Sequence, residues 1–509
     1  MPGQIISGAR AIAVPELAQR AARAASGLRS LGVGESDTVA LLLRNDFPFL
    51  EASLAAVLAG AFAVPLNWNN KPNELRYVLD DCRAKVIVGH ADLLAAAGDS
   101  LPQDTPVLTV ETPPEVRSAY GIPDAAGRVP TGASEWDPWL AGFPPWTTPP
   151  RADRSSMIYT SGTTGRPKGV RRAPAGPEQL AATRQLFAET WGFHPEMRTA
   201  ITGPLYHTAP NAYALTAVNL GATAVLQPRF DAAELLALIE RHRITHMHMV
   251  PTMFVRLLKL PEAVRRRHDL SSLKWVIHAA APCPPDVKQA MIDWWGPIVH
   301  EYYGSTEAGL VTFVTAQEWL ARRGTVGRPT PTATVRIYDD AGNVLPPGQT
   351  GTIYMRQHAV TDFTYHGLED KRREVERAGL ITCGDMGFLD EDGYLYLSDR
   401  KIDMVISGGV NIYPAEIEAE LVNLPGVQDC AVFGIPDAEY GERLAAIVQP
   451  MPGARLTVAE VQDHIRRRLA DYKVPKLVEF RGDLPREDSG KIFKRRLREP
   501  FWKDAGRSI

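Results

Sequence analysis

Helix-like and strand-like segments alternate through much of this chain. Helical spacing of apolar residues gives way to short buried runs, and the pattern then repeats. The expected segments are helices over residues 15–31, 47–60 and 235–241 and strands over residues 38–43, 61–66, 246–250 and 274–280. Repeated strand–helix units imply parallel sheets covered by helices, so an α/β fold is expected. Residues 110–150, which are rich in Pro, Gly and Trp, are expected to form an irregular surface excursion.

The length of 509 residues exceeds what one simple core supports, because a domain takes roughly 150 residues. The sequence changes in character near Asp399 and Arg400, and the part beyond carries helix signals over 414–424 and 458–470. The sequence therefore predicts a large N-terminal region of several subdomains over residues 1–399. A small α+β C-terminal domain is expected over residues 400–509.

Composition excludes several classes of partner. The 45% hydrophobic and 23% charged residues are typical of a soluble globular protein, and a net charge of −3 gives no reason to expect nucleic acid or a membrane surface. The longest apolar run, residues 52–66, is shorter than the ~20 residues that span a bilayer. The 4 cysteines are widely spaced, so no metal cluster is expected. Without a signal-peptide pattern, a cytoplasmic location is expected.

The stretch from Tyr159 to Gly169 combines glycines, hydroxyl side chains and one lysine behind a short apolar lead-in. Glycines let the backbone turn tightly and bring N–H groups close to a ligand, while hydroxyl and ammonium groups add donors. Such a stretch suits a multiply charged anion such as a nucleotide triphosphate. It is not a Walker A loop, because Gly169 rather than Ser or Thr follows Lys168. A flexible surface loop is the alternative, and the density of donors disfavours it.

This stretch resembles the phosphate-binding motif of the adenylate-forming, or AMP-binding, superfamily, which includes acyl- and aryl-CoA synthetases, firefly luciferase and peptide-synthetase adenylation domains. The resemblance extends from about Glu16 to about Arg496, and further motifs follow in the family's order. It implies a member of the acyl- or aryl-CoA synthetase branch, similar to fatty-acid–CoA ligases, that binds ATP. The residues to which it assigns phosphate contacts are Thr160, Ser161, Gly162, Thr163, Thr164, Gly165 and Lys168.

A second motif, residues 302–307, reads Tyr-Tyr-Gly-Ser-Thr-Glu. By itself it is typical of a strand end followed by a capping Thr-x-Glu turn. The resemblance implies instead that Tyr303 packs on adenine beside Gly304, and that Thr306 and Glu307 serve the phosphates and Mg²⁺. A hard cation such as Mg²⁺ prefers oxygen ligands and retains waters and phosphate oxygens, so one protein carboxylate can suffice. Glu307 is therefore the expected metal ligand.

Two further residues are expected near the ribose of the nucleotide. A carboxylate can accept hydrogen bonds from both ribose hydroxyls, and the resemblance implies that role for Asp385 in residues 382–385. It also implies a ribose or phosphate contact for Arg400, close to the hinge of a mobile C-terminal lid. Ile402 occupies the hinge position, where the family commonly has Lys or Asp. A hinge needs free backbone dihedrals rather than a particular charge, so rotation is still expected.

The C-terminal part supplies two more expected contacts. Gly408 and Gly409 form a glycine turn before a helix that begins at Pro414, and the resemblance implies that they border the tunnel for the pantetheine arm of coenzyme A. Lys491 follows a Ser-Gly turn in the position where the family carries its adenylation lysine. A lysine ammonium there would offset charge on the attacking carboxylate and the α-phosphate.

Pocket residues are expected from two loops. His207, within residues 204–208, matches a family histidine that lines the acyl site, although a packed core histidine is a nearly equal alternative. Ala280, within residues 278–282, belongs to a stretch that resembles the small-residue loop beside adenine and substrate. His278 stands in that stretch where a smaller residue is more usual.

The resulting prediction is an ATP-dependent, AMP-forming acid–CoA ligase that activates a hydrophobic carboxylic acid as an acyl-adenylate. Its expected catalytic residues are Lys491, Thr306, Glu307 and His207. A medium- or long-chain fatty acid, an aryl acid or a steroid-type acid fits the apolar and small residues expected around the pocket. Two alternatives stay open: an enzyme that loads a carrier-protein phosphopantetheine, and a non-catalytic module that senses a nucleotide or ligand. The sequence leaves a homodimer open as well.

Overall fold

The predicted alternation of strands and helices is confirmed. The computed structural model describes residues 3–148, 154–160, 167–400, 403–407, 410–437, 440–486 and 492–503. Helix α1 (Val14–Ser30), strand β3 (Thr38–Leu42), helix α2 (Phe47–Leu58) and strand β4 (Phe62–Pro65) lie close to the expected bounds. The chain has an α/β fold in which parallel-rich sheets are covered by helices, as expected.

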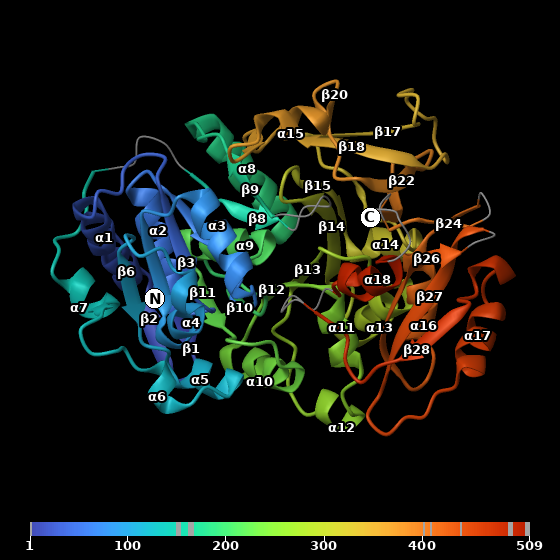
Figure 1. Cartoon of the computed structure of the whole chain (residues 1–509), viewed down its shortest axis with the longest axis horizontal. Coiled ribbons are helices and arrows are strands. Elements are labelled where there is room, and N and C mark those ends of the chain that lie inside the picture. Colours follow the sequence, from blue (N-terminus) through green and yellow to red (C-terminus); the bar gives the residue numbers. More distant parts are fainter. Residues whose placement is uncertain are drawn as a thin grey trace.

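A 9-stranded sheet forms the centre of the molecule (Figure 1). Its strand order is β16-β15-β14-β13-β12-β10-β11-β1-β2, and the strands from β14 to β1 run parallel. Strand β15 pairs antiparallel with both β14 and β16, and β2 pairs antiparallel with β1. The bounds are β1 (Gln4–Ser7), β2 (Arg10–Ala13), β10 (Arg198–Ile201), β11 (Thr223–Leu226), β12 (His246–Met249), β13 (Trp275–His278), β14 (Val299–Ser305), β15 (Gly309–Val314) and β16 (Arg328–Pro329). The parallel strands therefore end at one common edge.

Helices cover both faces of this sheet, because successive side chains of a strand point to opposite faces. On one face, Ile277 and Tyr302 pack with helices α8 (Pro177–Trp191) and α9 (Thr208–Asn219). On the other face, Val276 and Val299 pack with α10 (Ala232–His242), α11 (Pro251–Leu258) and α13 (Pro285–Trp295). The two faces thus have separate hydrophobic cores.

A second sheet of 5 parallel strands, ordered β4-β3-β5-β6-β7, holds much of the N-terminal part. Its other strands are β5 (Val86–His90), β6 (Val107–Val110) and β7 (Ser134–Glu135). Helices α3 (Pro72–Cys82) and α4 (Ala91–Ala97) pack on one face of it, with Leu79 and Leu94 in their shared core. Helices α1 and α2 pack on the face toward the central sheet.

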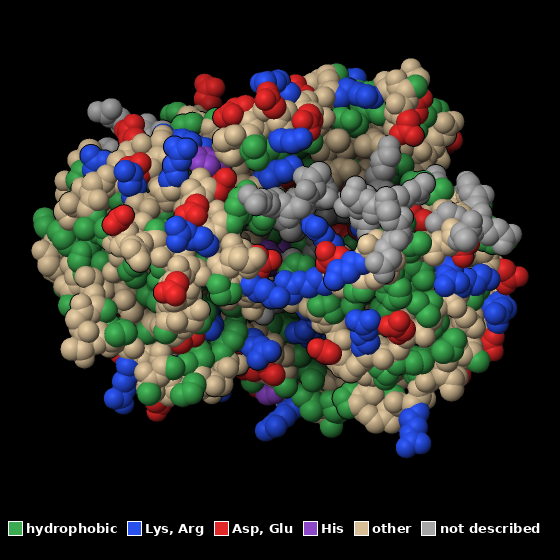
Figure 2. All heavy atoms as spheres, in the orientation of Figure 1, with side chains coloured by type: hydrophobic (Ala, Val, Ile, Leu, Met, Phe, Trp, Pro, Cys, Tyr) green, Lys and Arg blue, Asp and Glu red, His purple; other side chains and the backbone are tan. Residues whose placement is uncertain are grey.

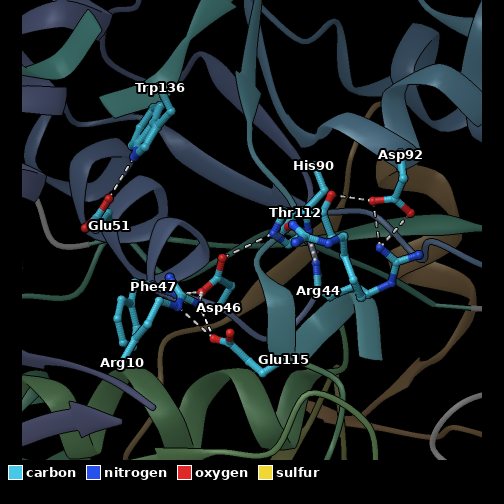
Figure 3. Close-up of polar contacts among 11 residues, drawn as sticks. Arg10, Arg44, Asp46, Phe47, Glu51, His90, Asp92, Thr112, Glu115 and Trp136 are labelled. Atoms are coloured by element: carbon cyan, nitrogen blue, oxygen red, sulfur yellow. Dashed lines mark hydrogen bonds and ion pairs between the residues drawn. The ribbon is translucent and has the colours of Figure 1, made fainter. Parts of the chain in front are cut away.

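A buried polar network joins this sheet to its neighbours (Figure 3). The Asp46 carboxylate, 1% exposed, accepts hydrogen bonds from the Phe47 N–H at 2.7 Å and from the Arg10 guanidinium at 2.6 Å. The Arg44 N–H donates to His90 Nδ1 at 3.1 Å, so His90 carries its proton on Nε2 and donates it to Asp46 at 3.3 Å. The network connects β2, the start of α2 and the end of β5.

The expectation of an irregular excursion over residues 110–150 is wrong. The described part of that range contains helices α5 (Pro114–Tyr120), α6 (Asp124–Gly127) and α7 (Trp136–Ala141) beside strand β7. Trp136 is 1% exposed, stacks on Trp139 at 5.5 Å and donates its indole N–H to Glu51 at 2.7 Å (Figure 3). These helices are short and flanked by Pro and Gly, which are loop signals in a sequence. The tertiary packing that stabilises the helices could not be predicted from those signals.

The part of the chain before the C-terminal part contains two further sheets. One has 3 strands, β19 (Phe363–Tyr365), β9 (Lys168–Arg172) and β8 (Ile158–Thr160). The other has 6 strands: β17 (Ala333–Tyr338), β18 (Gly351–Gln357), β20 (Glu376–Arg377), β21 (Leu380–Ile381), β22 (Asp385–Leu389) and β23 (Leu395–Arg400). The remaining short helices are η1 (Gly98–Ser100), α12 (Glu262–Arg265), α14 (Ala316–Ala321), α15 (Glu369–Glu374) and η2 (Asp471–Lys473).

The C-terminal part has a hydrophobic core of its own, in which Ile417, Val432, Ala446 and Val461 are fully buried. Its sheet pairs β25-β24-β27-β26 with β28 beside β27, and in Figure 1 it lies to the right, next to α11 and α13. The bounds are β24 (Val405–Ser407), β25 (Val410–Ile412), β26 (Val427–Asp437), β27 (Gly441–Pro450), β28 (Leu477–Phe480), α16 (Pro414–Val422), α17 (Val458–Arg466) and α18 (Lys494–Trp502). In the described part of the chain, no helix has the length and apolar character to cross a membrane.

Candidate functional site

A large cavity opens at the edge of the central sheet where its parallel strands end. Such edges are the usual ligand sites of α/β sheets. The cavity has a volume of about 2870 Å³ and extends from strands β8 and β9 to helix α18. Basic side chains gather beside the hollow in the middle of the face in Figure 2. The predicted residues that line the cavity are Thr160, Lys168, His207, Ala280, Tyr303, Gly304, Thr306, Glu307 and Asp385.

Lys168 is held at the start of β9. Antiparallel pairing of β8 and β9 places Thr160 opposite Lys168, and the Thr160 hydroxyl donates to the Lys168 carbonyl at 3.5 Å. The Lys168 ammonium lies 5.0 Å from the centre of the Tyr365 ring, within the range of a cation–π interaction. The sheet thus brings a cation to the cavity wall beside an aromatic ring of β19.

The Glu307 carboxylate lies next to the same ring. The Tyr365 hydroxyl donates to Glu307 Oε1 at 3.1 Å, and the Cys383 thiol lies 3.9 Å from Oε2. Burial raises the pKa of Tyr365, and the negative charge of Glu307 adds to the shift, so the phenol stays a protonated donor. Lys168 and Glu307, from sequence motifs far apart, therefore share one aromatic contact.

Arg172, at the other end of β9, fixes the backbone that carries Glu307. Its guanidinium donates to the carbonyls of Thr306 and Glu307 at 2.8 and 2.9 Å, and to the carbonyl of Thr361 at 2.7 Å. Burial lowers the pKa of Arg172 to about 10, which leaves it charged at neutral pH. Hydrogen bonds from a charged donor are stronger than neutral ones. Arg172 thus holds the turn after β14 in place.

Thr306 also contacts the segment that carries His207. Its hydroxyl lies 2.7 Å from the hydroxyl of Thr208, the first residue of α9. His207 stands at the N-cap position of that helix, with its ring 4.4 Å from the ring of Tyr206. Asn45 holds the preceding segment, because its amide donates to the Gly203 carbonyl at 2.9 Å and accepts from the Leu205 N–H at 3.0 Å.

Tyr303 and Asp385 meet on the nucleoside side of the predicted site. The Tyr303 hydroxyl donates to Asp385 Oδ2 at 2.6 Å, and β22 places Asp385 opposite Arg400 of β23. Gly304 is required by close packing, since a Cβ atom there would lie 2.0 Å from the Gly309 carbonyl oxygen. The glycine of the motif therefore has a structural reason that is independent of any ligand.

The loop after β13 turns sharply at Ala280, whose φ of 75° is unusual for a residue with a side chain. Strained backbone of this kind clusters at binding sites, and Ala280 is exposed to the cavity. His278, two residues earlier, points into the core instead, where its ring lies 5.1 Å from the ring of Phe254. It thus fills the core beneath the loop.

One end of the cavity is apolar. It lies between α8 and α9, where Leu180, Phe187, Ala212 and Leu215 line it. Tyr302 and His248, from the facing strands of the central sheet, line it as well. This end lies beside His207, so an apolar ligand there would place a polar head near Thr306 and Glu307.

Several predicted residues lie outside the described residues. They are Ser161, Gly162, Thr163, Thr164, Gly165, Ile402, Gly408, Gly409 and Lys491. For Arg400, the structure describes the strand position and not the side chain.

Sequence reasoning missed Arg172 and Tyr365. Arg172 is one of two adjacent arginines in a strand, and nothing local distinguishes the buried one from its neighbour. Tyr365 is 58 residues from Glu307 in the chain, so only the fold brings them together.

The oxygen atoms at and beside Glu307 are suitable ligands for Mg²⁺. A carboxylate and the neighbouring Thr306 hydroxyl are hard oxygen ligands of the kind that this cation prefers. The described residues contain no group of three or more His, Cys, Asp or Glu side chains that could hold a metal ion. A cation at Glu307 would therefore take its other ligands from phosphate oxygens and water.

Family models match most of the chain. The model of the AMP-binding enzyme matches residues 5–363, and that of the AMP-binding enzyme C-terminal domain matches residues 416–491. A feruloyl-CoA synthase of Amycolatopsis sp is 36% identical over 97% of this chain and 95% of its own length. A long-chain-fatty-acid–CoA ligase of Bacillus subtilis is 32% identical over 94% of this chain and 88% of its own length.

A solved structure has the same architecture. It is that of an anthranilate CoA ligase in complex with anthranoyl-AMP, which superposes with a TM-score of 0.85. The two chains are 26% identical, and the match covers 99% of this chain and 95% of the other.

Proposed function

This chain belongs to the family of AMP-binding enzymes and is an AMP-forming acid–CoA ligase, and on that basis we propose that it activates a hydrophobic carboxylic acid with ATP and transfers the acyl group to coenzyme A. The observation that carries this proposal is the composition of the cavity. A cation and a carboxylate stand at one side of it, and an apolar chamber opens at the other.

The chemistry requires these two sides to meet. A carboxylate is a poor acyl donor, because its leaving group would be oxide. Attack of a carboxylate oxygen on the α-phosphorus of ATP forms the acyl–phosphate bond and releases pyrophosphate. The thiol of coenzyme A then displaces AMP and forms the thioester. Such phosphoryl chemistry depends mainly on positioning and on stabilisation of charge, so the protein need only hold the reactants in line.

The predicted residues have distinct roles in this proposal. Lys168 neutralises phosphate charge, together with the hydroxyl and glycine stretch from Thr160 to Gly165. Tyr303 packs on adenine, and Asp385 accepts hydrogen bonds from the ribose. His207 lines the site of the acyl carboxylate. Glu307 and Thr306 hold Mg²⁺, which when bound offsets the negative charge of the phosphates.

The C-terminal part acts as a lid in the proposal. We place the boundary at residues 399 and 400, at the end of β23. Lys491 completes the site for adenylation, and rotation of the lid then brings Gly408 and Gly409 to the path of the pantetheine arm. Arg400, beside the pivot, contacts the ribose or phosphate. The C-terminal part has a separate hydrophobic core, whose buried members fall between Val405 and Val478, and this core supports such a movement as a rigid unit.

Release of pyrophosphate from ATP in the presence of a panel of carboxylic acids tests the proposal. Each acid is assayed with Mg²⁺, with and without coenzyme A, and thioesters are identified by mass spectrometry. We expect pyrophosphate release with hydrophobic acids and thioester only with coenzyme A. If none of the acids is turned over, the result would instead support a sensing module. Transfer to carrier-protein phosphopantetheine but not to coenzyme A would support the loading enzyme, which the names of the relatives do not favour.

A further inference from the structure

Three aromatic side chains form one corner of the apolar end of the cavity. Trp191 comes from α8, His248 from β12 and Tyr302 from β14, and all three line the cavity. The ring centres lie 5.9 Å apart for Trp191 and Tyr302, 5.8 Å for His248 and Tyr302, and 6.3 Å for Trp191 and His248. These separations are those of aromatic rings that pack against one another, so the three side chains form one aromatic cluster at the cavity wall.

The corner is also polar. His248 Nε2 lies 3.0 Å from the Tyr302 hydroxyl oxygen. Burial lowers the pKa of His248 to about 4 and raises the pKa of Tyr302, so both groups are neutral at pH 7. Whichever of the two atoms donates, the phenol oxygen keeps the capacity for a second hydrogen bond. The pair thus presents an uncharged hydrogen-bonding group in an apolar surrounding.

Trp191 contributes its ring to the corner. Its side chain is 3% exposed, and its indole nitrogen, which has no hydrogen-bond partner among the residues that the structure describes, is itself buried. A ligand in the cavity therefore meets the ring of Trp191, while the hydroxyl of Tyr302 supplies the hydrogen-bonding group.

We propose that this corner of Trp191, His248 and Tyr302 selects an aromatic carboxylic acid whose ring carries a neutral hydrogen-bonding substituent, such as a hydroxyl or carbonyl group. The inference rests on the function proposed above and narrows its substrate class. The aromatic side chains bind the ring, and the phenol of Tyr302 binds the substituent. A second carboxylate is disfavoured, because His248 and Tyr302 are both neutral and supply no positive charge to balance it.

An aliphatic acid is the competing occupant. The cavity also borders Ala18 and Ala21 of α1 and Leu54 of α2, which are small or apolar. A long acyl chain would extend along these residues and avoid the polar corner. The test must therefore include the outcome that the enzyme prefers an aliphatic acid to an aromatic one.

The first experiment uses the wild-type enzyme with matched acids. Values of kcat/KM for thioester formation are compared for 3-phenylpropanoic acid, its 2-, 3- and 4-hydroxy derivatives, and decanoic acid. We expect at least one hydroxy derivative to exceed the parent acid and decanoic acid by ~10-fold, the effect of one well-formed hydrogen bond. A highest kcat/KM for the parent acid or for decanoic acid overturns the inference while the proposed function stands. No thioester with any acid contradicts the proposed function itself.

Variants then assign the preference to the corner. Tyr302→Phe keeps the ring and removes the hydroxyl. It should bring the ratio of kcat/KM between the best hydroxy derivative and its parent to about one. Tyr213→Phe is the control: its hydroxyl lies in the same aromatic cluster but bonds to Thr199 at 3.5 Å. That variant should keep the wild-type ratio. An unchanged ratio in Tyr302→Phe overturns the inference.

Discussion

At the scale of single residues, a buried ion pair stands out beside strand β14, near the cavity residue Tyr303. Lys288 of α13 is 0% exposed, donates to Glu301 Oε2 at 2.6 Å and lies 4.8 Å from the ring centre of Trp319. Burial raises the pKa of Glu301, and the Lys288 ammonium opposes that shift. The pair joins α13 to β14, two residues before Tyr303. It therefore contributes to the position of the motif that ends this strand.

Removal of one partner should be costly. Lys288→Met leaves a carboxyl group buried without its cation, and we expect the free energy of unfolding to fall by about 3–5 kcal/mol. The double variant Lys288→Met/Glu301→Leu should recover most of this loss, because apolar residues of similar volume replace both charges. Urea unfolding followed by circular dichroism measures both. Equal destabilisation of single and double variants would show that packing, rather than the unpaired charge, dominates.

At the scale of elements, the strands of the central sheet carry buried neutral histidines. Burial lowers the pKa values of His246 and His248 in β12, and of His300 in β14, to about 4. His300 has a defined role, because its Nδ1 accepts the N–H of Ala316 at 3.1 Å, at the start of α14. Protonation of Nδ1 would break this bond. The folded sheet therefore favours the neutral form of these imidazole rings.

The stability of the protein should fall on acidification from pH 6.5 toward pH 4. In that range the unfolded chain protonates these histidines and the folded chain does not, so the unfolded state binds more protons and gains stability as the pH falls. His300→Asn keeps an acceptor near the position of Nδ1 but cannot titrate. Its unfolding free energy should vary less steeply between pH 6 and 4.5, by about 1.4 kcal/mol per pH unit. Urea unfolding across this range measures the slope, and an unchanged slope would contradict the prediction.

Elements of regular periodicity were predictable from sequence, whereas those shaped by distant contacts were not. In helices α1 and α2, most of the residues that are buried in the structure are apolar residues of the sequence pattern. Helix α7 exists because Trp136 reaches Glu51, some 85 positions away in the chain, and no local signal contains that contact. In the same way, motif residues such as Lys168, Glu307 and Asp385 were recognisable as sequence. Arg172 and Tyr365, which position them, depend on pairing between β9 and β19.

At the scale of the whole molecule, the C-terminal part touches the rest through polar contacts as well as packing. Lys259, which follows α11, donates to the carbonyls of Val427 and Gln428, the former at 2.9 Å. The Asn423 side-chain amide donates to Asp286 Oδ2 at 3.1 Å. Hydrogen bonds of this kind can be exchanged for water without exposing a core. Under the proposed function, a C-terminal part with its own hydrophobic core would rotate as a lid at modest cost.

A lid that serves two steps predicts separable half-reactions. Lys491→Ala should lower the rate of adenylation by about 100-fold or more, because an ammonium that offsets charge at the α-phosphate is removed. Thioester formation from supplied acyl-adenylate should persist in the same variant. Stopped-flow pyrophosphate release and thioester chromatography measure the two steps. Lys476→Ala, at an exposed lysine of the same part, is the control and should match the wild type in both. Equal loss in both steps would contradict the division of labour.

The two ends of strand β9 set a limit on how this protein can be altered. Lys168 stands at one end, beside the ring that touches Glu307, and Arg172 at the other end binds the backbone of Glu307. If the β8–β9 hairpin were replaced by that of a relative, the new hairpin would thus supply different contacts to the turn of Thr306 and Glu307. Recombination within the family should succeed where the crossover keeps residues 158–172, 306–307 and 361–365 together from one parent. Crossovers that divide them should give folded but inactive chimeras.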